Sequence, residues 1–281
     1  MNAVDVLVAV RREHASRYYK SLSAQKNFRV QIVSDTGDAL NALADRDQHV
    51  DVLVLDNGLA HIFEFVAELR HSYPRLLIVL VDEDADFGMP GQADEISTEP
   101  FNNNDLVRRI NRLMSDRQLE TLRADSLPAV RQFAKLIRKA SGEIGKQEAA
   151  VSACKDLGYD YVAFYRRDDS NGGQLVLKAQ DGSNAIKAIA IKTADPDDLM
   201  TWVQQNRQSR ITNPPDNPNH PLVAKGRLGC AACVPVIFGS NNYGVLLACR
   251  EQPGSISQEN VLMLELVAAQ LSAAISKEIV G

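Results

Sequence analysis

The chain has 281 residues, more than one ordinary compact domain holds, so two domains are expected. Its composition, 45% hydrophobic and 24% charged, is that of a globular protein and excludes an intrinsically disordered chain. The net charge is −5, and residues 1–125 are the acidic part, with 21 acidic and 14 basic side chains. Because such a surface repels polyanions, nucleic acid is not expected as a partner.

Targeting signals are not recognisable. The longest apolar runs, such as Leu76–Val81 and Gly244–Cys249, are far shorter than the roughly 18 residues that span a bilayer. The N-terminus, MNAVDVLVAV, lacks a basic region before its apolar run and contains Asp5, unlike a signal peptide. We therefore expect a cytoplasmic protein that does not bind membranes.

The first 125 residues alternate short apolar runs with stretches of helical period, which is typical of βα units in a parallel sheet. The predicted strands are rich in Val, Ile and Leu, as strands covered on both faces are: Val4–Val10, Arg29–Val33, Val52–Leu55, Leu76–Val81 and Glu95–Ser97. Helices are expected between them. The second follows the capping residues 34–36 and the third covers Ile62–Arg70. The pattern predicts an α/β domain with a doubly wound parallel sheet.

A long helix is predicted over residues 103–126, with residues 102–104 as its cap. Its apolar residues keep one helical period: Leu106, Ile110, Leu113, Leu119 and Leu122. Pro128 interrupts this period, and a second amphipathic segment covers Leu127–Ala140. We place a domain boundary near Asp125, with a first domain at 1–120, a linking helix at 103–126 and a second domain at 127–281.

The second half has a mixed α+β pattern. Strands with period-two alternation are predicted at Tyr161–Arg166, Leu175–Ala179, Ile186–Ile191, Ala231–Phe238 and Tyr243–Arg250. Helices are predicted near Gln147–Leu157, at Asp197–Gln205 and from Ser257 onward. The segment ITNPPDNPNHP, residues 211–221, contains too many prolines for a strand and is predicted as a loop.

Three segments of the first half resemble response-regulator receiver domains over residues 1–120. DVLVLD at 51–56, LLIVLV at 76–81 and ADEISTEPF at 93–101 are similar to that family's third strand, fourth strand and fifth-strand loop. The resemblance implies that Asp56 occupies the place of the phosphoryl-accepting aspartate. Asp56 should therefore lie at the carboxyl edge of the sheet, where α/β sheets bind ligands.

The other functional positions of that family are replaced here. Val10 and Arg11 stand in place of two adjacent acidic residues, Val81 in place of a Thr or Ser, and Glu99 in place of a Lys before Pro100, which we expect to follow a cis bond. Phosphoryl transfer needs a bound divalent cation and a fixed lysine. We therefore expect Asp56 to pair with Arg11 instead of being phosphorylated. A cap at the end of a strand, residual phosphorylation and a phosphorylation-independent contact surface all remain open readings of Asp56.

Residues 127–280 resemble the GAF family through YDYVAFY at 159–165, LMTWV at 199–203, CVPVI at 233–237, YGVLLAC at 243–249 and LMLELVAAQL at 262–271. The resemblance implies a small sensory domain with a six-stranded antiparallel sheet. Phe164, Trp202, Cys233 and Val245 are the candidate pocket residues, and core packing is the alternative for them. His220 has no neighbouring cysteine, as a bilin site would require, and no cyclic-nucleotide signature occurs. No cofactor is predicted, and the identity of a ligand stays open.

Cysteine and histidine patterns point away from metal binding and catalysis. The four cysteines are expected to be buried, reduced thiols. Cys230 and Cys233 have zinc-ligand spacing, but residues three apart on a strand point to opposite faces, so no metal site is expected. No hydrolase, P-loop or dinucleotide motif occurs, and the five histidines lack ligand spacing, so the protein is not expected to be an enzyme.

These features favour a cytosolic signal-transduction regulator, an atypical response regulator that works by protein contacts. A GAF half would sense a small molecule or partner and act along the linking helix on the receiver-like half. The apolar stripes of the flanking helices predict a homodimer, and a histidine kinase or another regulator is the expected partner. The alternatives are a scaffold without a ligand, a conventional phosphorylation-dependent response regulator, and a transcription cofactor.

Overall fold

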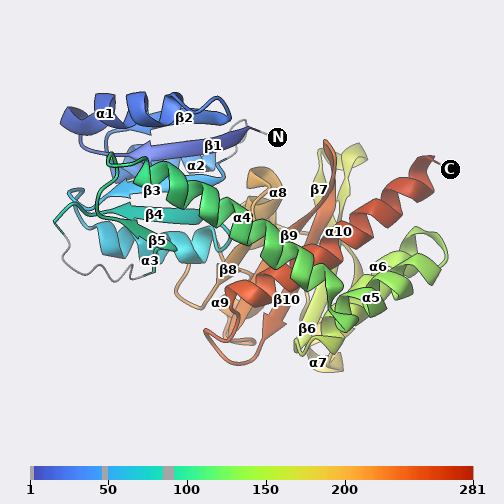
Figure 1. The fold of residues 1–281 in the computed structure, drawn as a ribbon. Coiled ribbons are helices and arrows are strands. Elements are labelled where there is room, and N and C mark those ends of the chain that lie inside the picture. The colour runs from blue at the N-terminus through green and yellow to red at the C-terminus, as the bar shows by residue number, and fades with distance from the viewer. Residues whose placement is uncertain (1–2, 46–49, 85–91, 281) are drawn as a thin grey trace. The chain divides into compact units, whose positions relative to one another are not determined.

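The computed structural model describes residues 3–45, 50–84 and 92–280 (Figure 1). The chain forms two compact units. Residues 1–70 and 75–120 make the first, and residues 71–74 and 121–281 make the second. Among the described residues, buried apolar side chains form core clusters beside the parallel sheet and on both faces of the antiparallel sheet.

The first unit is built on a five-stranded parallel sheet with the doubly wound order β2-β1-β3-β4-β5. The strands are β1 Val4–Ala9, β2 Phe28–Val33, β3 Val52–Asp56, β4 Leu77–Val81 and β5 Glu95–Ser97. All five residues of β3 are buried, as its unbroken apolar run predicts. The predicted α/β class is confirmed.

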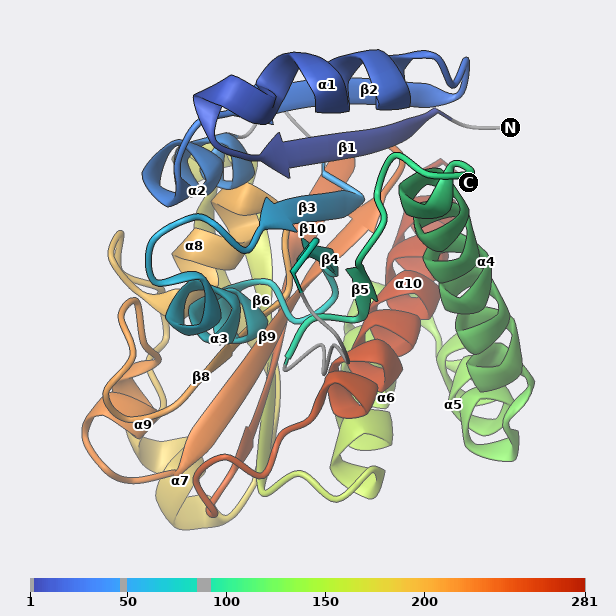
Figure 2. The ribbon, with the colours of Figure 1, turned by 60° about the vertical axis from the view of Figure 1, so that its left-hand side comes forward.

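In the described part of this unit, four helices cover the sheet: α1 Arg12–Ser23, α2 Thr36–Ala44, α3 Ile62–Ser72 and α4 Asp105–Ser126. Tyr18 of α1 and Ile110 of α4 share one cluster with Val8 and Val54 of the sheet, so α1 and α4 cover the same face. Figure 2 shows α2 and α3 on the side away from α4. Each buried Val, Leu or Ile of this core stabilises the fold by about 1.5–3 kcal/mol.

The connection between β4 and β5 differs from the predicted pattern. The sequence predicted a helix between every pair of strands, but residues 82–84 and 92–94 are not helical. The remainder of this connection, residues 85–91, lies outside the described residues. Asp94 fixes the start of β5, because its Oδ2 accepts hydrogen bonds from the Ile78 amide at 2.6 Å and from Arg70 at 2.7 Å.

The second unit contains a five-stranded antiparallel sheet with the order β7-β6-β10-β9-β8. Its strands are β6 Tyr161–Asp168, β7 Gln174–Gly182, β8 Arg210–Thr212, β9 Cys230–Phe238 and β10 Asn241–Arg250. Its helices are α5 Pro128–Lys139, α6 Gly142–Asp156, α7 Asn184–Ile189, α8 Leu199–Asn206, α9 Pro221–Ala224 and α10 Gln258–Val280, with a short 3-10 turn at Asp169–Asn171. The predicted α+β class of this half is confirmed.

Both faces of the antiparallel sheet are covered. α5, α6 and α10 pack on one face, and α10 lies along β9 with α6 and α5 beside it (Figure 2). We call this the helical face. Residues of α8, α9 and the adjoining loops pack on the other, which we call the loop face.

One helix among the described residues, Gln258–Glu278 within α10, is long and apolar enough to cross a membrane. Its mean hydropathy is 1.2, and 56% of it is buried inside the unit. Val261, Leu264 and Leu271 are fully buried in the core beside the sheet. Core helices of globular proteins have these same features.

One predicted strand of this unit is wrong. Ile186–Ile191, predicted as a strand, lies mainly in helix α7, because the Ser183 hydroxyl caps the helix at the Ile186 amide. Among the described residues the sheet therefore has five strands, not six, and only an isolated bridge between Val176 and Thr193 follows α7. The predicted loop at 211–221 is found over residues 213–220, with its first two residues in β8 and its last in α9.

Gly244 marks an irregular point between the two central strands. The register of β10 against β9 shifts between Asn242 and Gly244, and Gly244 has a φ of 142°. A Cβ atom at this position would collide with the carbonyl oxygen of Tyr165 on β6. Only glycine allows the three strands to approach this closely.

We expect Gly244→Ala to lower the free energy of unfolding of the second unit by about 2–4 kcal/mol, because it combines backbone strain with a steric collision. Gly226→Ala is the matched control, since Gly226 has a φ of 64° but no atom within 4 Å of its ideal Cβ. That control should cost about 1 kcal/mol. Urea unfolding followed by the fluorescence of Trp202, the one tryptophan, measures both. Equal losses for the two variants would contradict the collision.

Candidate functional site: the Asp56 pocket

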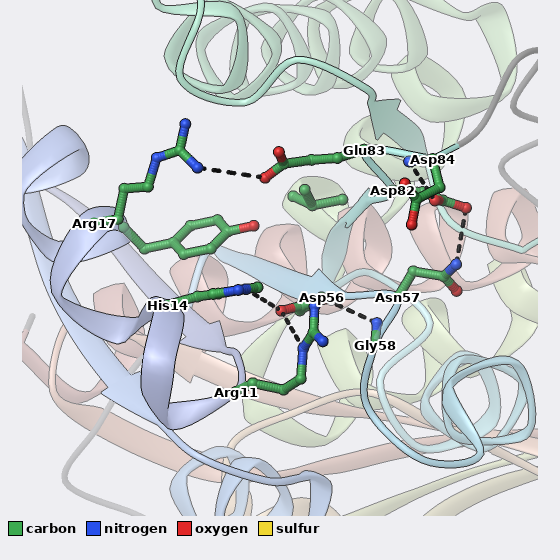
Figure 3. Close-up of a pocket in the computed structure, with 11 residues that line it drawn as sticks. Arg11, His14, Arg17, Asp56, Asn57, Gly58, Asp82, Glu83 and Asp84 are labelled. Carbon is green, nitrogen blue, oxygen red and sulfur yellow. Dashed lines mark hydrogen bonds and ion pairs between the residues drawn. The ribbon is translucent and has the colours of Figure 1, made fainter.

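A pocket of about 350 Å³ opens at the carboxyl edge of the parallel sheet, around Asp56 (Figure 3). Asp56 is the last residue of β3, and doubly wound sheets bind ligands at this edge. Three segments contribute the lining: the start of α1, the turn after β3 and the end of β4. The lining residues are Arg11, His14, Arg17, Tyr18, Asp56, Asn57, Gly58, Val81, Asp82, Glu83 and Asp84.

The Asp56 carboxylate is buried and held by three donors. Its side chain is 8% exposed. The Gly58 amide donates to Oδ1 at 2.8 Å, Arg11 Nε donates to Oδ2 at 3.4 Å, and His14 Nδ1 lies 3.2 Å from Oδ2. Burial acts to raise the pKa of Asp56, but these hydrogen bonds and the charge of Arg11 outweigh it, so the pKa lies below its usual value. Asp56 is therefore a charged group at neutral pH.

Arg11 provides the compensating charge that the sequence predicted. Its guanidinium lies against Gly58, where an added Cβ would be 2.5 Å from the Arg11 Cζ. Glycine at this position therefore lets the guanidinium settle beside Asp56 (Figure 3). The described residues contain no group of three or more His, Cys, Asp or Glu side chains arranged to hold a metal ion.

The opposite wall of the pocket is acidic. Asp82 accepts a hydrogen bond from Asn57 Nδ2 at 2.8 Å and from the Asp84 amide at 3.2 Å. Glu83 lies 4.0 Å from Arg17. The pocket thus has basic side chains on its α1 wall and carboxylates on its β4 wall.

Aromatic packing supports the α1 wall from behind. The Arg17 guanidinium lies 3.8 Å above the Phe101 ring, and the rings of Phe101 and Tyr18 meet edge to face at 4.8 Å. Burial, and then the charge of Asp56, raise the pKa of Tyr18 well above its usual value. Tyr18 therefore stays neutral.

Only part of the predicted receiver-like site lies in the pocket. Asp56, Arg11 and Val81 line it, whereas Val10 is fully buried in the sheet core, and Glu99 and Pro100 are not among the lining residues. The predicted cis bond before Pro100 is wrong, since the cis bond found among the described residues is Asn217–Pro218. The Glu99 carbonyl accepts from the Asn102 amide at 3.0 Å and closes a turn with a trans bond at Pro100.

The sequence analysis missed His14 and Arg17. Both lie on the same face of α1 as Arg11, at intervals of three residues, which places all three side chains at one pocket wall. That spacing is visible in the sequence once Arg11 is placed beside Asp56. The acidic wall at Asp82, Glu83 and Asp84 directly follows a predicted strand and was open to the same argument.

The candidate GAF pocket residues do not form one group. Trp202, Cys233 and Val245 belong to the loop face, but Phe164 is buried on the helical face. The grouping of Phe164 with the other three is therefore wrong, because the alternation of β6 points Tyr161, Ala163 and Tyr165 to the loop face instead.

Two buried polar groups adjoin the loop face: His220, which the sequence analysis considered only as part of a bilin site, and Asp198, which it did not single out. His220 is completely buried, its Nδ1 accepts from the Leu222 amide at 3.3 Å, and burial lowers its pKa to about 3. Asp198 caps α8 by accepting from the Thr201 amide at 2.9 Å, and burial raises its pKa. Neither residue has a sequence signature that separates it from an ordinary helix cap.

The four cysteines are free and buried. Cys230 lies on the helical face and Cys233 on the loop face, as the strand geometry predicted. Burial raises the pKa of Cys154, Cys233 and Cys249 well above the usual thiol value, so these thiols are poor nucleophiles.

We expect Arg11→Ala to destabilise the first unit by about 1–2 kcal/mol at pH 7, a modest loss because the Arg11 side chain is 44% exposed. The folded pKa of Asp56 is lowered, so its contribution is present above the unfolded value of about 3.9 and is lost as the pH falls through the folded value. The difference between variant and wild type should therefore shrink below about pH 4.

Hydrogen exchange of the β1 and β3 amides, corrected for intrinsic rates at each pH, reports on this sheet alone. Arg12→Ala is the control, since Arg12 is exposed and has no ion pair in the described part of the chain. It should change the opening free energy by less than about 0.5 kcal/mol. A loss in Arg11→Ala that is independent of pH would contradict the pairing with Asp56.

Comparison with known protein families gives a match within the second unit. Residues 147–276 match the family described as GAF domain. No curated protein matches the sequence. Two similar solved structures are GAF domains of phosphoenolpyruvate-protein phosphotransferases. The one from Acinetobacter has 20% identity over 54% of this chain and 93% of that chain, with a TM-score of 0.46. The one from Coxiella burnetii has 18% identity over 58% and 96%, with a TM-score of 0.46.

A third similar structure is the free methionine-R-sulfoxide reductase from Neisseria meningitidis, with 16% identity over 54% of this chain and 88% of that chain and a TM-score of 0.47. The family match coincides with α6, the antiparallel sheet and most of α10. Residues 147–276 of this chain thus match the GAF domain family.

Proposed function

We propose that this protein is a non-catalytic, cytosolic signalling regulator in which a pseudo-receiver domain acts through protein contacts under the control of the GAF domain. The GAF domain gives the chain a sensory or signalling role. The observation that carries the finer proposal is the Arg11–Asp56 pair at the carboxyl edge of a doubly wound sheet.

The receiver-like character rests on position. The strand order is doubly wound, and an aspartate ends the third strand beside a pocket. In a phosphorylated site, a divalent cation held by several oxygens would offset the charge of the incoming phosphoryl group. Here the Arg11 guanidinium and His14 already contact the Asp56 oxygen that faces them. Asp56 is thus a structural anion, and the domain works without phosphorylation.

Helix α4 is the proposed route between the two domains. It runs without a break for 22 residues, or about 33 Å, from Asp105 to Ser126. Its first half contributes Leu106 and Ile110 to the core of the first unit, and Ala124 belongs to the core of the second. A displacement of α4 at one end would therefore shift the side chains packed around its other end.

The same helix supports a homodimer. Leu119 and Leu122 are 47% and 64% exposed, one helical turn apart. Exposed leucines with this spacing commonly pack against a second helix. The output in this proposal is a contact with another protein, such as a histidine kinase or a second regulator.

A scaffold without a ligand is the second candidate. The loop face of the GAF sheet is filled by packed side chains, among them Leu199, Met200 and Val245 at 0% exposure. A GAF domain whose loop face is filled in this way can serve as a dimerisation module without a ligand. A ligand that copurifies with the protein distinguishes the sensor from the scaffold.

Incubation with acetyl phosphate and Mg²⁺ should leave the intact mass of the protein unchanged, because Arg11 and His14 occupy the carboxylate that would accept the phosphoryl group. Intact-mass spectrometry measures this directly, with Asp56→Asn as the matched control. A phosphoryl adduct present in the wild type and lost in Asp56→Asn would make this a conventional phosphorylation switch.

Native mass spectrometry of protein purified without denaturation should give the mass of a dimer. Replacing Leu119 and Leu122 with Glu should shift it to the monomer, because both side chains are exposed in one chain and would be buried in the dimer. Lys135→Glu, an exposed substitution on α5, is the control. A wild-type protein that is monomeric at micromolar concentration would refute the dimer.

A further inference from the structure

Helix α1 bears the concentrated basic segment of an otherwise acidic domain. Residues 11–26 contain five Arg or Lys side chains and one Glu, whereas the other residues up to 125 contain nine basic and twenty acidic side chains. This segment follows β1 and ends before β2, so its charges gather on one helix and its two ends. The asymmetry singles out α1 from the rest of the first unit.

The basic side chains divide between two faces of α1. Arg11, His14 and Arg17 line the Asp56 pocket, where each lies near a carboxylate. Arg12, Tyr19 and Lys20 are exposed on the outer side, and Tyr18 and Leu22 point into the core. Tyr19 is 52% exposed. The outer face therefore presents two cations and an aromatic ring within about 12 Å along the helix.

The outer cations are not neutralised by the domain itself. In the described part of the chain, Arg12 and Lys20 have no ion-pair partner, and Lys26 is exposed and likewise unpaired. Three basic residues in the first half of α4 differ, since Arg108, Arg109 and Arg112 each contact Asp105 or Glu95. A helix of an acidic domain that leaves its cations unpaired is complementary to an acidic partner.

We propose that the outer face of α1, defined by Arg12, Tyr19 and Lys20, binds an acidic helix or peptide of a partner protein. Tyr19, next to Lys20 and two helical turns from Arg12, is the aromatic anchor, and the two cations set orientation and speed of association. The acidic remainder of the domain opposes long polyanions, which favours a short acidic segment over a nucleic acid or an anionic membrane. This inference rests on the proposed protein-contact function and gives it a surface and a partner chemistry.

The test uses the full chain and a fluorescein-labelled helical peptide of glutamate and alanine, followed by fluorescence anisotropy. Binding should weaken steeply with added salt. Arg12→Glu combined with Lys20→Glu should weaken it about tenfold or more, and Tyr19→Ala should weaken it at constant salt dependence. Lys135→Glu, a single charge reversal on exposed α5, should have little effect. Unchanged circular dichroism establishes that the variants fold.

Other outcomes overturn the proposal. If the wild type does not bind the peptide, or if Lys135→Glu weakens binding as much as the Arg12/Lys20 variant does, the α1 face is not the binding surface. Tighter binding of duplex DNA or of phosphatidylserine vesicles than of the peptide assigns the face to another partner. A change of oligomeric state in the Arg12/Lys20 variant makes the occupant a second copy of this chain. Failure of the pseudo-receiver proposal is seen separately, as a phosphoryl adduct on Asp56 with peptide binding unchanged.

Discussion

The buried negative charge of Asp56 is the constraint on which the first unit depends. A carboxylate that is 8% exposed is costly unless donors and a cation lie beside it. The Gly58 amide, His14 and Arg11 provide both, and each fixes a further element. Arg11 and His14 bring the start of α1 to the end of β3, and Arg11 in turn requires glycine at position 58. The edge of the sheet is thereby closed by one ion pair that joins the start of α1 to the end of β3.

Where both faces of a strand are apolar, the sequence predicts the strand but not which side chains point to which face. The strands of the first unit were predictable because unbroken Val and Leu runs occur only where both faces are covered. The pair between Arg11 and Asp56 was predictable from the positions of two strand ends. Phe164 was not, since residues 161–165 are all buried and the alternation of β6 has no polar side chain to fix its direction. The register irregularity at Phe164 and Tyr165 adds to that ambiguity.

The strand prediction for Ile186–Ile191 was wrong for a different physical reason. The isoleucines of this segment fit a short strand and a single helical turn equally well, and periodicity over six residues cannot separate the two. The Ser183 side chain favours the helix. Its hydroxyl accepts a hydrogen bond from the Ile186 amide, which in a strand would need a partner on a neighbouring strand. At the loop face, the burial of Asp198 and His220 was not predicted, because each occupies the position of an ordinary helix cap. Burial, which sequence does not record, makes them unusual.

One helix connects the site to the surface proposed for a partner. The inner side of α1 carries Arg11 and His14 against Asp56, and its outer side carries Arg12, Tyr19 and Lys20. A helix moves as a rigid body. A partner that binds the outer side and shifts α1 would therefore also shift the backbone that holds Arg11 beside Gly58. The Arg11 guanidinium fills the space beside Gly58, where an added Cβ would force that side chain to shift. In a conventional receiver, a phosphoryl group would change the charge at the sheet edge. Here a contact on α1 can change the same charge pair mechanically, with no covalent step at Asp56.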